Sequence, residues 1–439
     1  MRILVLGNGA REHAICSALS RSKKNPEIFS FASAKNPGIY QLAKKMKIAD
    51  LFDFAELKRF ANFHKIDFAV LGPDDPIAAG AADALAEIGI PSIGPTKKLA
   101  QIESSKSYTR DLLEKYGIKG NPKFEIFTRK NFANAKTFAH KCGEIVVKFD
   151  GLAGGKGVQV QGDHFKNVNE GLEYAQECIE KSGKVVIEEK LVGQEFSLLF
   201  FVDGNSAIPM PVVQDNKRAL ENDCGPNTGG MGTISDSNFL LPFLTEKDLR
   251  EATEISEKTI DALQHESEQK YCGILFGGFI ATKKGVRLIE FNARFGDPES
   301  LNILSILKTD FCEICEKMIA GKIADIKVEF QKKATVCKYV VPKGYPENPE
   351  KNSEIKIDFH NIPKNCQLFF GSVYEKEKKF FLSGSRAIGL VGIADSIYEA
   401  EKIAELSTSN ISGNVFHRSD IGTEKFITQK IIMMESLRN

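Results

Sequence analysis

A regular alternation of apolar and helical segments over the first 100 residues limits the possible folds more than any other feature of this chain. Strands are expected at 2–6, 27–33, 67–71 and 91–93, with helices at 12–21 and 78–88. Strands that alternate with helices form a parallel sheet with helices on both faces. Ligands of such sheets bind beyond the carboxyl ends of the strands, where the segments Gly7–Glu12 and Gly72–Asp75 fall.

The pattern changes after Gly94-Pro95-Thr96, which breaks the chain and begins a new unit. A helix at 104–116 is followed by Gly117, a residue suited to end it. Further strands are expected at 144–149, 158–161, 184–189, 195–202, 278–282 and 287–291, and helices at 171–182, 246–264, 301–319 and 396–406. A chain of 439 residues is too long for one hydrophobic core, so several domains are expected.

Composition argues against several classes of protein. The chain has 59 Lys and Arg residues and 58 Asp and Glu residues, a formal net charge of +1. A charge this small gives no overall electrostatic attraction to a nucleic-acid backbone. No apolar run approaches the roughly 18 residues of a membrane span, and the apolar run at Met1–Gly7 is too short for a signal peptide. The nine scattered cysteines favour reduced thiols in a cytoplasmic protein, and we interpret the Cys312–Cys315 pair as buried apolar side chains.

The segment from Gly7 to His13 follows the first expected strand and reads Gly-Asn-Gly-Ala-Arg-Glu-His. Its glycines allow backbone N–H groups to approach a phosphate at a helix N-terminus. A dinucleotide fingerprint has a third glycine where this chain has Glu12, whose carboxylate would repel a pyrophosphate. NAD, another phosphate or sugar ligand and a plain turn all stay open, with a single phosphate or sugar favoured. His13 is expected to be a helix residue without a catalytic role.

A second glycine-rich segment, Asp150–Gly157, connects the two strands of an expected hairpin. It is not a Walker A loop, because Lys156 is followed by glycine rather than by Ser or Thr. Its glycines, Gly154 and Gly155 among them, can still form an anion cradle that closes over a triphosphate and excludes water. A flexible hairpin with an exposed lysine is the alternative.

Two further segments carry polar groups at strand ends or turns. Glu188 and Glu189 end an apolar strand whose backbone groups can hold an adenine edge, and Glu195 can accept hydrogen bonds from ribose hydroxyls, although ordinary strand ends look similar. Lys217 and Arg218 precede a segment with four glycines, Gly225-Pro-Asn-Thr-Gly-Gly-Met-Gly232. Adjacent basic side chains beside such a turn suit anionic substrate groups.

The strand at 287–291 continues into a polar stripe. Glu290, Asn292 and Arg294 are spaced two residues apart, so their side chains point to the same face of a strand. Glu290 and Asn292 offer oxygens to Mg²⁺, which prefers few protein ligands together with phosphate oxygens. Arg294 can stabilise charge on a transferring phosphoryl group or clamp a carboxylate.

Taken together, these segments resemble the ATP-grasp superfamily and, within it, the phosphoribosylamine–glycine ligases. The resemblance is carried by 7–13, 72–76, 94–96, 104–106, 150–158, 187–189, 214–218, 225–232, 290–299 and 417–422. It implies that ATP phosphorylates glycine to glycyl phosphate, which 5-phosphoribosylamine attacks. The products would be glycinamide ribonucleotide, ADP and phosphate, in purine biosynthesis.

The resemblance also implies roles for individual residues. ATP contacts would come from Lys106, Lys148, Gly154, Gly155, Lys156, Glu188, Glu189, Leu191 and Glu195. The substrates would be held by Asn8, Gly9, Asp74, Asp215, Asn227, Thr228, Gly229 and Gly230, with Arg294 and Lys217 as catalytic residues. Glu290 and Asn292 would bind Mg²⁺ or Mn²⁺.

The implied fold is α/β in its first part and α+β overall. It comprises an N-terminal parallel-sheet domain that binds substrate (1–102), a two-lobed ATP-grasp domain (103–325) with a lid lobe at 124–190, and a mixed C-terminal domain (326–439). The expected partners are small molecules, with no nucleic acid and no membrane. A monomer is expected, with a homodimer left open.

The chain departs from the family pattern at four places. Asn216 stands where His or Tyr is usual, the segment 163–184 is short, Leu382–Arg386 lacks the customary Gly-Gly-Arg, and Gly278 stands near a further metal-ligand position. Three other functions were weighed. The segments 7–13 and 225–232 argue against another ATP-grasp ligase or carboxylase, Glu12 argues against an NAD-dependent dehydrogenase, and the intact polar stripe argues against a non-catalytic regulator.

Overall fold

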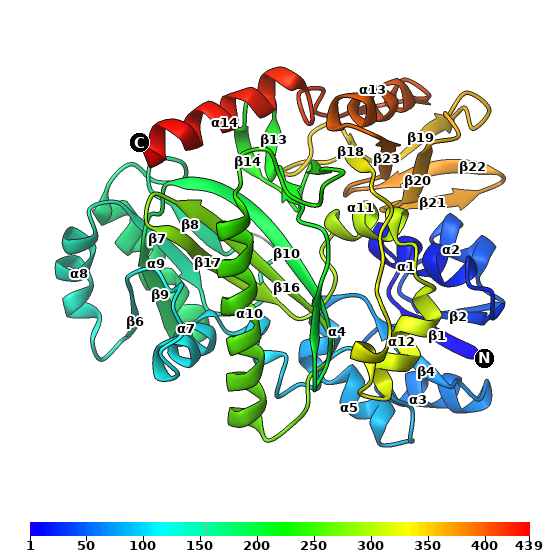
Figure 1. Ribbon diagram of the computed structural model, residues 1–439, viewed down its shortest axis with the longest axis horizontal. Coiled ribbons are helices and arrows are strands. Elements are labelled where there is room, and N and C mark those ends of the chain that lie inside the picture. The colour runs from blue at the N-terminus through cyan, green and yellow to red at the C-terminus, as the bar shows by residue number, and fades with distance from the viewer. Residues whose placement is uncertain (155) are drawn as a thin grey trace.

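The computed structural model describes residues 1–154 and 156–439 of the chain. The first part is a five-stranded sheet in the order β3-β2-β1-β4-β5, and every neighbouring pair is parallel (Figure 1). Its strands are β1 (Arg2–Leu6), β2 (Glu27–Ala32), β3 (Lys45–Ile48), β4 (Phe68–Leu71) and β5 (Ser92–Ile93). The parallel sheet predicted from the alternating pattern is therefore confirmed.

Five helices accompany this sheet. They are α1 (Ala10–Ser20), α2 (Pro37–Leu42), α3 (Phe54–Phe63), α4 (Asp74–Ala79) and α5 (Ala81–Ala86). The single helix predicted at 78–88 is wrong, because the chain turns at Gly80, whose φ of 108° lies in the left-handed region that glycine tolerates. The first of the two helices, α4, starts shortly after the carboxyl end of β4, and Asp74 lies in its first turn.

The lid lobe has its own antiparallel sheet in the order β6-β9-β7-β8. Its elements are β6 (Phe124–Thr128), a short 3₁₀ turn η1 (Phe132–Asn134), α8 (Ala135–Cys142), β7 (Ile145–Phe149), β8 (Val158–Val160), α9 (Val168–Ser182) and β9 (Lys184–Glu189). Buried side chains of the sheet and both helices, such as Phe127, Val147 and Ile179, form a core of their own. No residue of this core belongs to the main core of the described chain.

The large lobe contains the long strands of the molecule. A sheet in the order β11-β10-β16-β17 combines β10 (Gly193–Asp203), β11 (Ala207–Pro209), β16 (Cys272–Thr282) and β17 (Gly285–Asn292). The helices are α6 (Gln101–Ser104), α7 (Lys106–Lys115), α10 (Glu246–Ser267), α11 (Glu299–Ile306) and α12 (Phe311–Ile319). The helix predicted at 301–319 is wrong as a single element, because Leu307 bridges to Phe330 and the Asp310 carboxylate caps a second helix.

The last part of the chain is mixed. Strands β12 (Gln214–Asp215) and β15 (Gly232–Ser235) join β18 (Ala334–Pro342), β23 (Ile388–Ala394) and β20 (Cys366–Phe370), and β25 (Val415–Phe416) pairs with β18. A second sheet orders β21 (Val373–Lys376), β22 (Lys379–Ser383), β19 (Lys351–Ile357) and β24 (Ile411–Ser412), and a hairpin joins β13 (Arg218–Leu220) to β14 (Cys224–Asn227). The remaining elements are η2 (Ile323–Asp325), α13 (Ile397–Thr408) and α14 (Glu424–Arg438).

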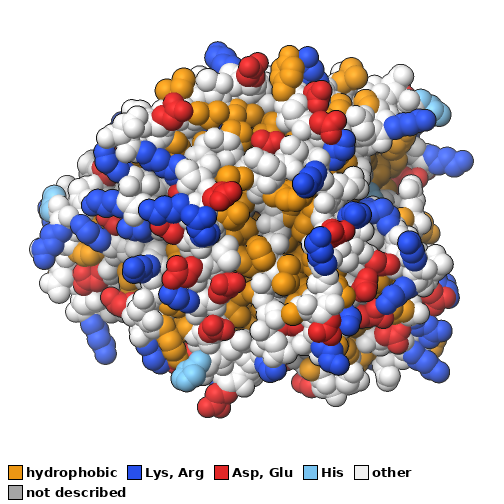
Figure 2. All heavy atoms as spheres, in the orientation of Figure 1, with side chains coloured by type: hydrophobic (Ala, Val, Ile, Leu, Met, Phe, Trp, Pro, Cys, Tyr) orange, Lys and Arg blue, Asp and Glu red, His pale blue; other side chains and the backbone are white. Residues whose placement is uncertain are grey.

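One main core runs through the parallel sheet, the large lobe and part of the last sheet. Apolar side chains show through the middle of the face in Figure 2, and Lys and Arg side chains gather over the lid lobe on its left. Among the described helices, none combines the length and the hydropathy that a membrane crossing requires.

Candidate active site

The loop after β1 is held by Glu12 from the first turn of α1. Its Oε2 accepts the backbone N–H of Gly9 at 2.5 Å, and the same side chain fills the space against Gly72, where an added Cβ would lie 2.0 Å from Oε1. Glu12 thus occupies a donor that a pyrophosphate would otherwise use. This geometry agrees with the sequence argument against a dinucleotide.

Asn8 and His13 both serve the local structure. Oδ1 of Asn8 accepts hydrogen bonds from the N–H of Ser33 at 3.1 Å and from its hydroxyl at 2.7 Å, which joins the loops after β1 and β2. Nδ1 of His13 accepts the N–H of Phe370 at 2.9 Å, and burial lowers the pKa of His13 to about 4. His13 is a buried residue of α1, as predicted, and its imidazole accepts a hydrogen bond from the last part of the chain.

A buried ionic cluster lies between the lid lobe and the large lobe. The carboxylate of Glu188, at the end of β9, accepts a hydrogen bond from Arg110 Nε at 2.6 Å and lies 2.9 Å from Lys148 Nζ. Lys148 Nζ also donates to the carbonyl of Ile289 at 2.8 Å. Burial would raise the pKa of Glu188, but the two cations hold it below its ordinary value. Both carboxylate oxygens of Glu188 are therefore occupied by cations within the protein.

The other groups expected at the adenine end lie at the same strand end. Glu189 Oε1 accepts the N–H of Lys123 at 2.9 Å, and Leu191 is half-buried just beyond β9. Glu189 and Leu191 therefore lie at the carboxyl end of β9, where the adenine-binding edge was predicted.

The glycine-rich loop begins at a fixed point. Oδ1 of Asp150 accepts the N–H of Ser107 at 3.0 Å at the start of α7, and Lys184 Nζ lies 2.9 Å from Oδ2. Lys106 Nζ donates to the carbonyl of Gly151 at 3.2 Å. The loop base is thus tied to α7 on one side and to β9 on the other.

The tip of the same loop contains three residues expected to contact ATP. Gly154 has a φ of 54°, in the left-handed region, and the N–H of Lys156 donates to the carbonyl of Ala153 at 2.9 Å. Gly155 lies outside the described residues. The turn brings the Lys156 backbone back to Ala153, next in the chain to Gly154, one of the glycines predicted to cradle phosphate.

Arg294 follows β17 and is fixed from α6. Its Nη2 lies 3.1 Å from Glu103 Oε1, and the second oxygen of Glu103 accepts the N–H of Ala293 at 2.7 Å. Nη2 also lies 3.4 Å from Asn292 Oδ1, while the buried Nε has no hydrogen-bond partner among the described residues. Leaving a buried donor without a partner is costly, and Arg294 Nε is such a donor among the described residues.

Glu290 is surrounded by positive charge. Burial would raise the pKa of its carboxyl, but the charges around it hold that pKa below its ordinary value: Lys106, Lys217, Lys148 and Arg294. No donor among the described residues lies within hydrogen-bonding distance of this carboxylate. Glu290 is therefore an ionised carboxylate with free lone pairs in the middle of the site.

Glu290 and Asn292 together match what a magnesium-type ion requires. One free carboxylate and one amide oxygen lie on the same side of β17, and hard cations of this kind take few protein ligands and fill the remaining positions with water and phosphate. In the described part of the chain no group of three or more His, Cys, Asp or Glu side chains could hold a metal. A site that relies on ligand phosphates agrees with this donor set.

Lys217 lies at the other side of the site and contacts Glu195. Its Nζ donates to Glu195 Oε2 at 3.1 Å, so residues expected at the ribose and at the reacting groups lie next to each other. Asp215 Oδ1 is buried without a described partner. Burial and the neighbouring Glu299 raise the pKa of Asp215 well above its ordinary value, while Glu299 itself accepts from Ser197 Oγ at 3.1 Å.

The glycine-rich turn after β14 is closely ordered. The Thr228 hydroxyl donates to the Lys217 carbonyl at 2.8 Å and accepts the N–H of Gly230 at 3.0 Å. Arg386 donates to the carbonyl oxygens of Gly229 and Gly230 from the last part of the chain. The turn therefore belongs to the same site as Lys217, as predicted from its sequence.

Asn227 and Asp74 complete the predicted set. Asn227 Nδ2 lies 3.4 Å from His164 Nε2 at the rim of the lid lobe. Asp74 lies in the first turn of α4, and although burial would raise its pKa, Arg294 and Arg11 hold that pKa below its ordinary value. Asp74 thus couples the carboxyl end of β4 electrostatically to the polar stripe.

Three residues of the site were not identified from the sequence: Arg110, Glu103 and Arg386. Arg110 is four residues after Lys106 and therefore on the same face of α7, a spacing that could have indicated it. Glu103 carries no local signal, because its partner Arg294 lies 191 residues away along the chain, whereas Arg386 stands where the family pattern has Gly-Gly-Arg, which could have indicated it.

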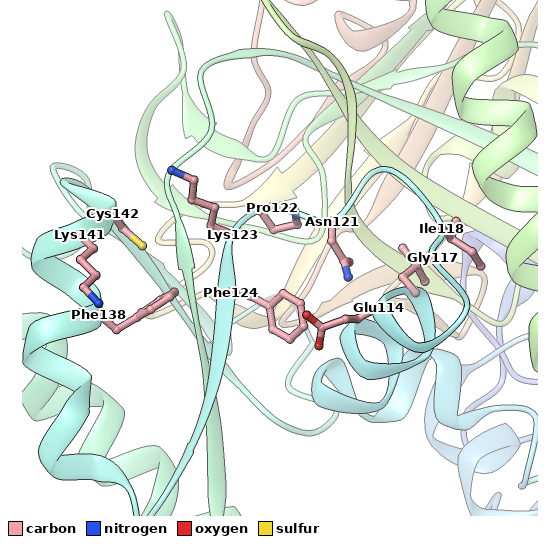
Figure 3. Close-up of a pocket in the computed structure, with 11 residues that line it drawn as sticks. Glu114, Gly117, Ile118, Asn121, Pro122, Lys123, Phe124, Phe138, Lys141 and Cys142 are labelled. Carbon is pink, nitrogen blue, oxygen red and sulfur yellow. The ribbon is translucent and has the colours of Figure 1, made fainter.

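The pocket of Figure 3 lies away from these groups. It has a volume of about 520 Å³ between the end of α7, β6 and α8, and it is lined by apolar side chains such as Leu113, Phe124 and Phe138 with Glu114 and Lys141 among them. None of the residues predicted for the site lines it. A second, much smaller cavity of about 10 Å³ is instead lined by Glu103, Lys106 and Glu290.

A two-lobed nucleotide-binding fold, a lysine-bearing lid and a carboxylate–amide pair beside a buried, ion-paired arginine define an enzyme of the ATP-grasp class. Family models match along the chain: the N domain of phosphoribosylglycinamide synthetase at residues 1–103, its ATP-grasp (A) domain at 104–300 and its C domain at 335–424. The chain belongs to the phosphoribosylglycinamide synthetase family. Its activity is the ATP-dependent ligation of phosphoribosylamine and glycine, a step of de novo purine biosynthesis, and it uses ATP together with a divalent metal ion.

Individual relatives are similar to this chain over its full length. The chain is 46% identical to a phosphoribosylamine–glycine ligase of Methanosarcina barkeri and 47% identical to one of Methanocaldococcus jannaschii, with 100% of each chain covered. A crystal structure of the Thermotoga maritima phosphoribosylamine–glycine ligase superposes with a TM-score of 0.80 at 27% identity, covering 96% of this chain and 100% of that one. A biotin carboxylase of Campylobacter jejuni shares the fold, with a TM-score of 0.73 at 14% identity, covering 99% and 95%.

Proposed function

We propose that the ligation proceeds through glycyl phosphate. A carboxylate oxygen of glycine attacks the γ-phosphorus of ATP, and the bond from that phosphorus to the ADP oxygen breaks. The amine nitrogen of 5-phosphoribosylamine then attacks the carbonyl carbon, the C–O bond to phosphate breaks, and the nitrogen loses one proton. The products are glycinamide ribonucleotide, ADP and inorganic phosphate.

The single observation that carries this proposal is the state of Arg294. Its Nε is buried without a described partner, while Nη2 is held by Glu103, so the guanidinium is oriented in advance and one donor is left for a ligand. Phosphoryl transfer depends on positioned positive charge rather than on a protein nucleophile. Arg294 and Lys217, whose positive charges both act on the Glu290 carboxyl, are therefore assigned as the catalytic residues.

ATP is assigned to the interface between the lobes. Lys106, Lys148 and the loop with Gly154, Gly155 and Lys156 bind its phosphates. The adenine and ribose lie against the strand end that carries Glu188, Glu189, Leu191 and Glu195. The buried ionic cluster supports this placement, because it holds Lys148 in a fixed position beside the polar stripe.

Glycine and phosphoribosylamine are assigned to the opposite end. Asn8, Gly9 and Asp74 come from the parallel sheet, and Asp215 with residues 227–230 comes from the turn beside Lys217. Convergence of these segments on Arg294 and Lys217 supports the assignment. The carboxyl ends of parallel strands are also the usual place for such ligands.

Glu290 and Asn292 would hold the metal ion, Mg²⁺ or Mn²⁺. When bound, the ion neutralises charge on the phosphate oxygens of ATP. The free lone pairs of the ionised Glu290 carboxylate support this role, because the cations around it keep it charged and yet none of the described side chains donates to it.

We further propose that the chain divides at residues 102–103 and 325–326, that it acts as a monomer, and that it works in the cytoplasm. All nine cysteines are free thiols among the described residues, which supports a reducing compartment. The separate cores of the lid lobe and of the body support the inner division of the ATP-grasp domain.

The experiment that tests the intermediate uses glycine labelled with ¹⁸O in its carboxylate. Transfer of one ¹⁸O atom to inorganic phosphate, in an assay that needs ATP, a metal ion, glycine and freshly generated phosphoribosylamine, is the expected result. Label that stays wholly in the amide product and water would overturn glycyl phosphate. ADP release that ignores glycine or phosphoribosylamine would reopen the substrate assignment.

A further inference from the structure

A lysine from the last helix reaches the segment that carries Asp215 and Lys217. Lys430 lies in α14 and is only 7% exposed, and its Nζ donates to Gln214 Oε1 at 2.8 Å and to Asn216 Oδ1 at 3.0 Å. These two acceptors flank Asp215 on both sides in the sequence. The ammonium also lies 4.3 Å from the centre of the Phe426 ring, one turn earlier on the same helix.

Both acceptors also form hydrogen bonds with other parts of the site. Gln214 Nε2 donates to the carbonyl of Glu195 at 2.9 Å, and Asn216 Nδ2 donates to the carbonyl of Gly232 at 3.1 Å. The carbonyl of Asn216 accepts the N–H of Met231 at 2.8 Å. The three residues that follow one another at 214–216 are thus fixed to the ribose-side strand and to the glycine-rich turn.

The nature of the buried group is informative. Lys430 forms no ion pair with a carboxylate among the described residues, and its two direct partners are neutral amides. Asp223, Arg418, Asp420 and Glu195 act on it only at longer range. Burying a cation without a paired anion costs stability, and an apolar side chain of similar length would pack more cheaply. We therefore interpret the ammonium of Lys430 as a group that fixes the positions of its two amide acceptors, Gln214 and Asn216.

The helix that carries Lys430 is itself anchored at both ends. Thr423 caps its start, and Arg438 Nη2 lies 2.6 Å from Asp248 Oδ2 at the start of α10. Met433 contacts Gln194, and α14 packs along β10 and β16 beside the hairpin β13–β14 (Figure 1). The helix therefore holds Nζ in a fixed position relative to the large lobe.

We propose that Lys430 is a positioning residue for the ligation: it fixes Gln214 and Asn216, and through them sets the orientation of Asp215 and Lys217 toward glycine and phosphoribosylamine. This inference rests on the proposed placement of the two substrates at that end of the site. It assigns to α14, which lies almost entirely beyond the residues matched by the family models, a role in the amine-ligating half of the reaction.

The test compares Lys430→Met, which keeps the length and removes the donors, with Lys430→Gln, whose shorter amide can satisfy only one acceptor. Lys425→Met is the matched control, because Lys425 is exposed on the same helix. Three quantities are measured for each variant: kcat/KM for glycine, the affinity for a non-hydrolysable ATP analogue, and the thermal unfolding midpoint.

The expected result is a fall in kcat/KM for glycine of about tenfold or more in Lys430→Met, a smaller fall in Lys430→Gln, and analogue affinity within about threefold of wild type in both. Lys425→Met should match wild type throughout. Wild-type kinetics in folded Lys430→Met, or equal losses of glycine kinetics and analogue affinity, would overturn the proposal. If Lys430→Met does not fold, wild-type glycine kinetics in Lys430→Gln would overturn it instead.

Failure of the proposed function is visible separately. It would appear in the wild-type enzyme as ADP release that does not depend on glycine or phosphoribosylamine. A wild-type enzyme that needs both substrates, together with variants that behave like it, would reject only the role of Lys430.

Discussion

The guanidinium of Arg294 and the carboxylate of Glu103 form an ion pair of 3.1 Å that joins the end of β17 to α6. Glu103 is buried, and its second oxygen holds the N–H of Ala293, next to Arg294 in the chain. Burial of Arg294 works against its charge, but Glu103 and the other carboxylates nearby raise its pKa above the ordinary value. The arginine is therefore charged and oriented before any substrate arrives.

Replacing Arg294 with alanine should lower kcat by about 100-fold or more, because the charge that faces the transferring phosphoryl group is lost. ATP binding should change little, since Lys148 and Lys106 remain. Steady-state kinetics with a separate binding assay for an ATP analogue would measure both effects. Arg294→Lys serves as the control that keeps the charge without the oriented fork, and an unchanged kcat in Arg294→Ala would remove Arg294 from the mechanism.

Replacing Glu290 with glutamine should weaken metal binding by about tenfold or more, because the only free carboxylate of the polar stripe loses its charge. The readout is Mn²⁺ binding by electron paramagnetic resonance in the presence of an ATP analogue. Glu254→Gln, on the exposed face of α10, should bind Mn²⁺ like wild type. Equal Mn²⁺ affinity in Glu290→Gln and wild type would move the metal site elsewhere.

Replacing Glu188 with alanine should destabilise the folded protein by about 3–5 kcal/mol, because Arg110 and Lys148 would remain buried without their anion. Urea unfolding followed by circular dichroism measures this loss. Glu254→Ala breaks an exposed pair with Lys258, which solvent screens, and should leave stability close to that of the wild type. A loss of similar size in both variants would mean that the buried cluster contributes no more than a surface pair.

Acidification should reveal the buried neutral state of His13. Its pKa of about 4 lies below the ordinary 6.5, so the unfolded chain binds more protons between these values and stability falls as pH decreases through that window. The wild type should lose about 2 kcal/mol more between pH 7 and pH 5 than His13→Gln, whose amide oxygen can still accept from Phe370. Denaturant unfolding at the two pH values gives the difference, and identical losses would show that His13 is not neutral in the folded state.

The parts of this molecule that could be predicted from sequence are those specified by local pattern. The alternation of strands and helices gave the parallel sheet, and the two-residue spacing of Glu290, Asn292 and Arg294 gave the polar stripe. The break at Leu307–Asp310 was missed although Asp310 is a good helix cap, because the apolar residues on both sides have a continuous helical period. The helix α14 was also missed, since Lys430 interrupts its buried face of Phe426, Ile427 and Met434.

Contacts between distant segments were beyond prediction for a different reason. Arg110 and Glu188 are 78 residues apart, and Arg386 and Gly229 are 157 apart, so no local spacing indicates that they meet. A charge that is buried when distant segments pack together requires a hydrogen-bonding partner. Glu188 is that partner for Arg110, and the carbonyl of Gly229 is one for Arg386. The resemblance to a known family supplied the predicted site residues, whereas the contacts that hold them came only from the three-dimensional arrangement.

The lid lobe has a core that shares no residue with the main core, and it meets the body through contacts such as Arg110–Glu188, Lys148–Ile289 and Ser107–Asp150. Heat capacity changes on a conformational transition mainly reflect exposure of apolar surface. Opening this lobe exchanges polar contacts for water and leaves both cores intact, so its heat-capacity change should be small. The free energy of such a movement of the lobe should therefore vary almost linearly with temperature.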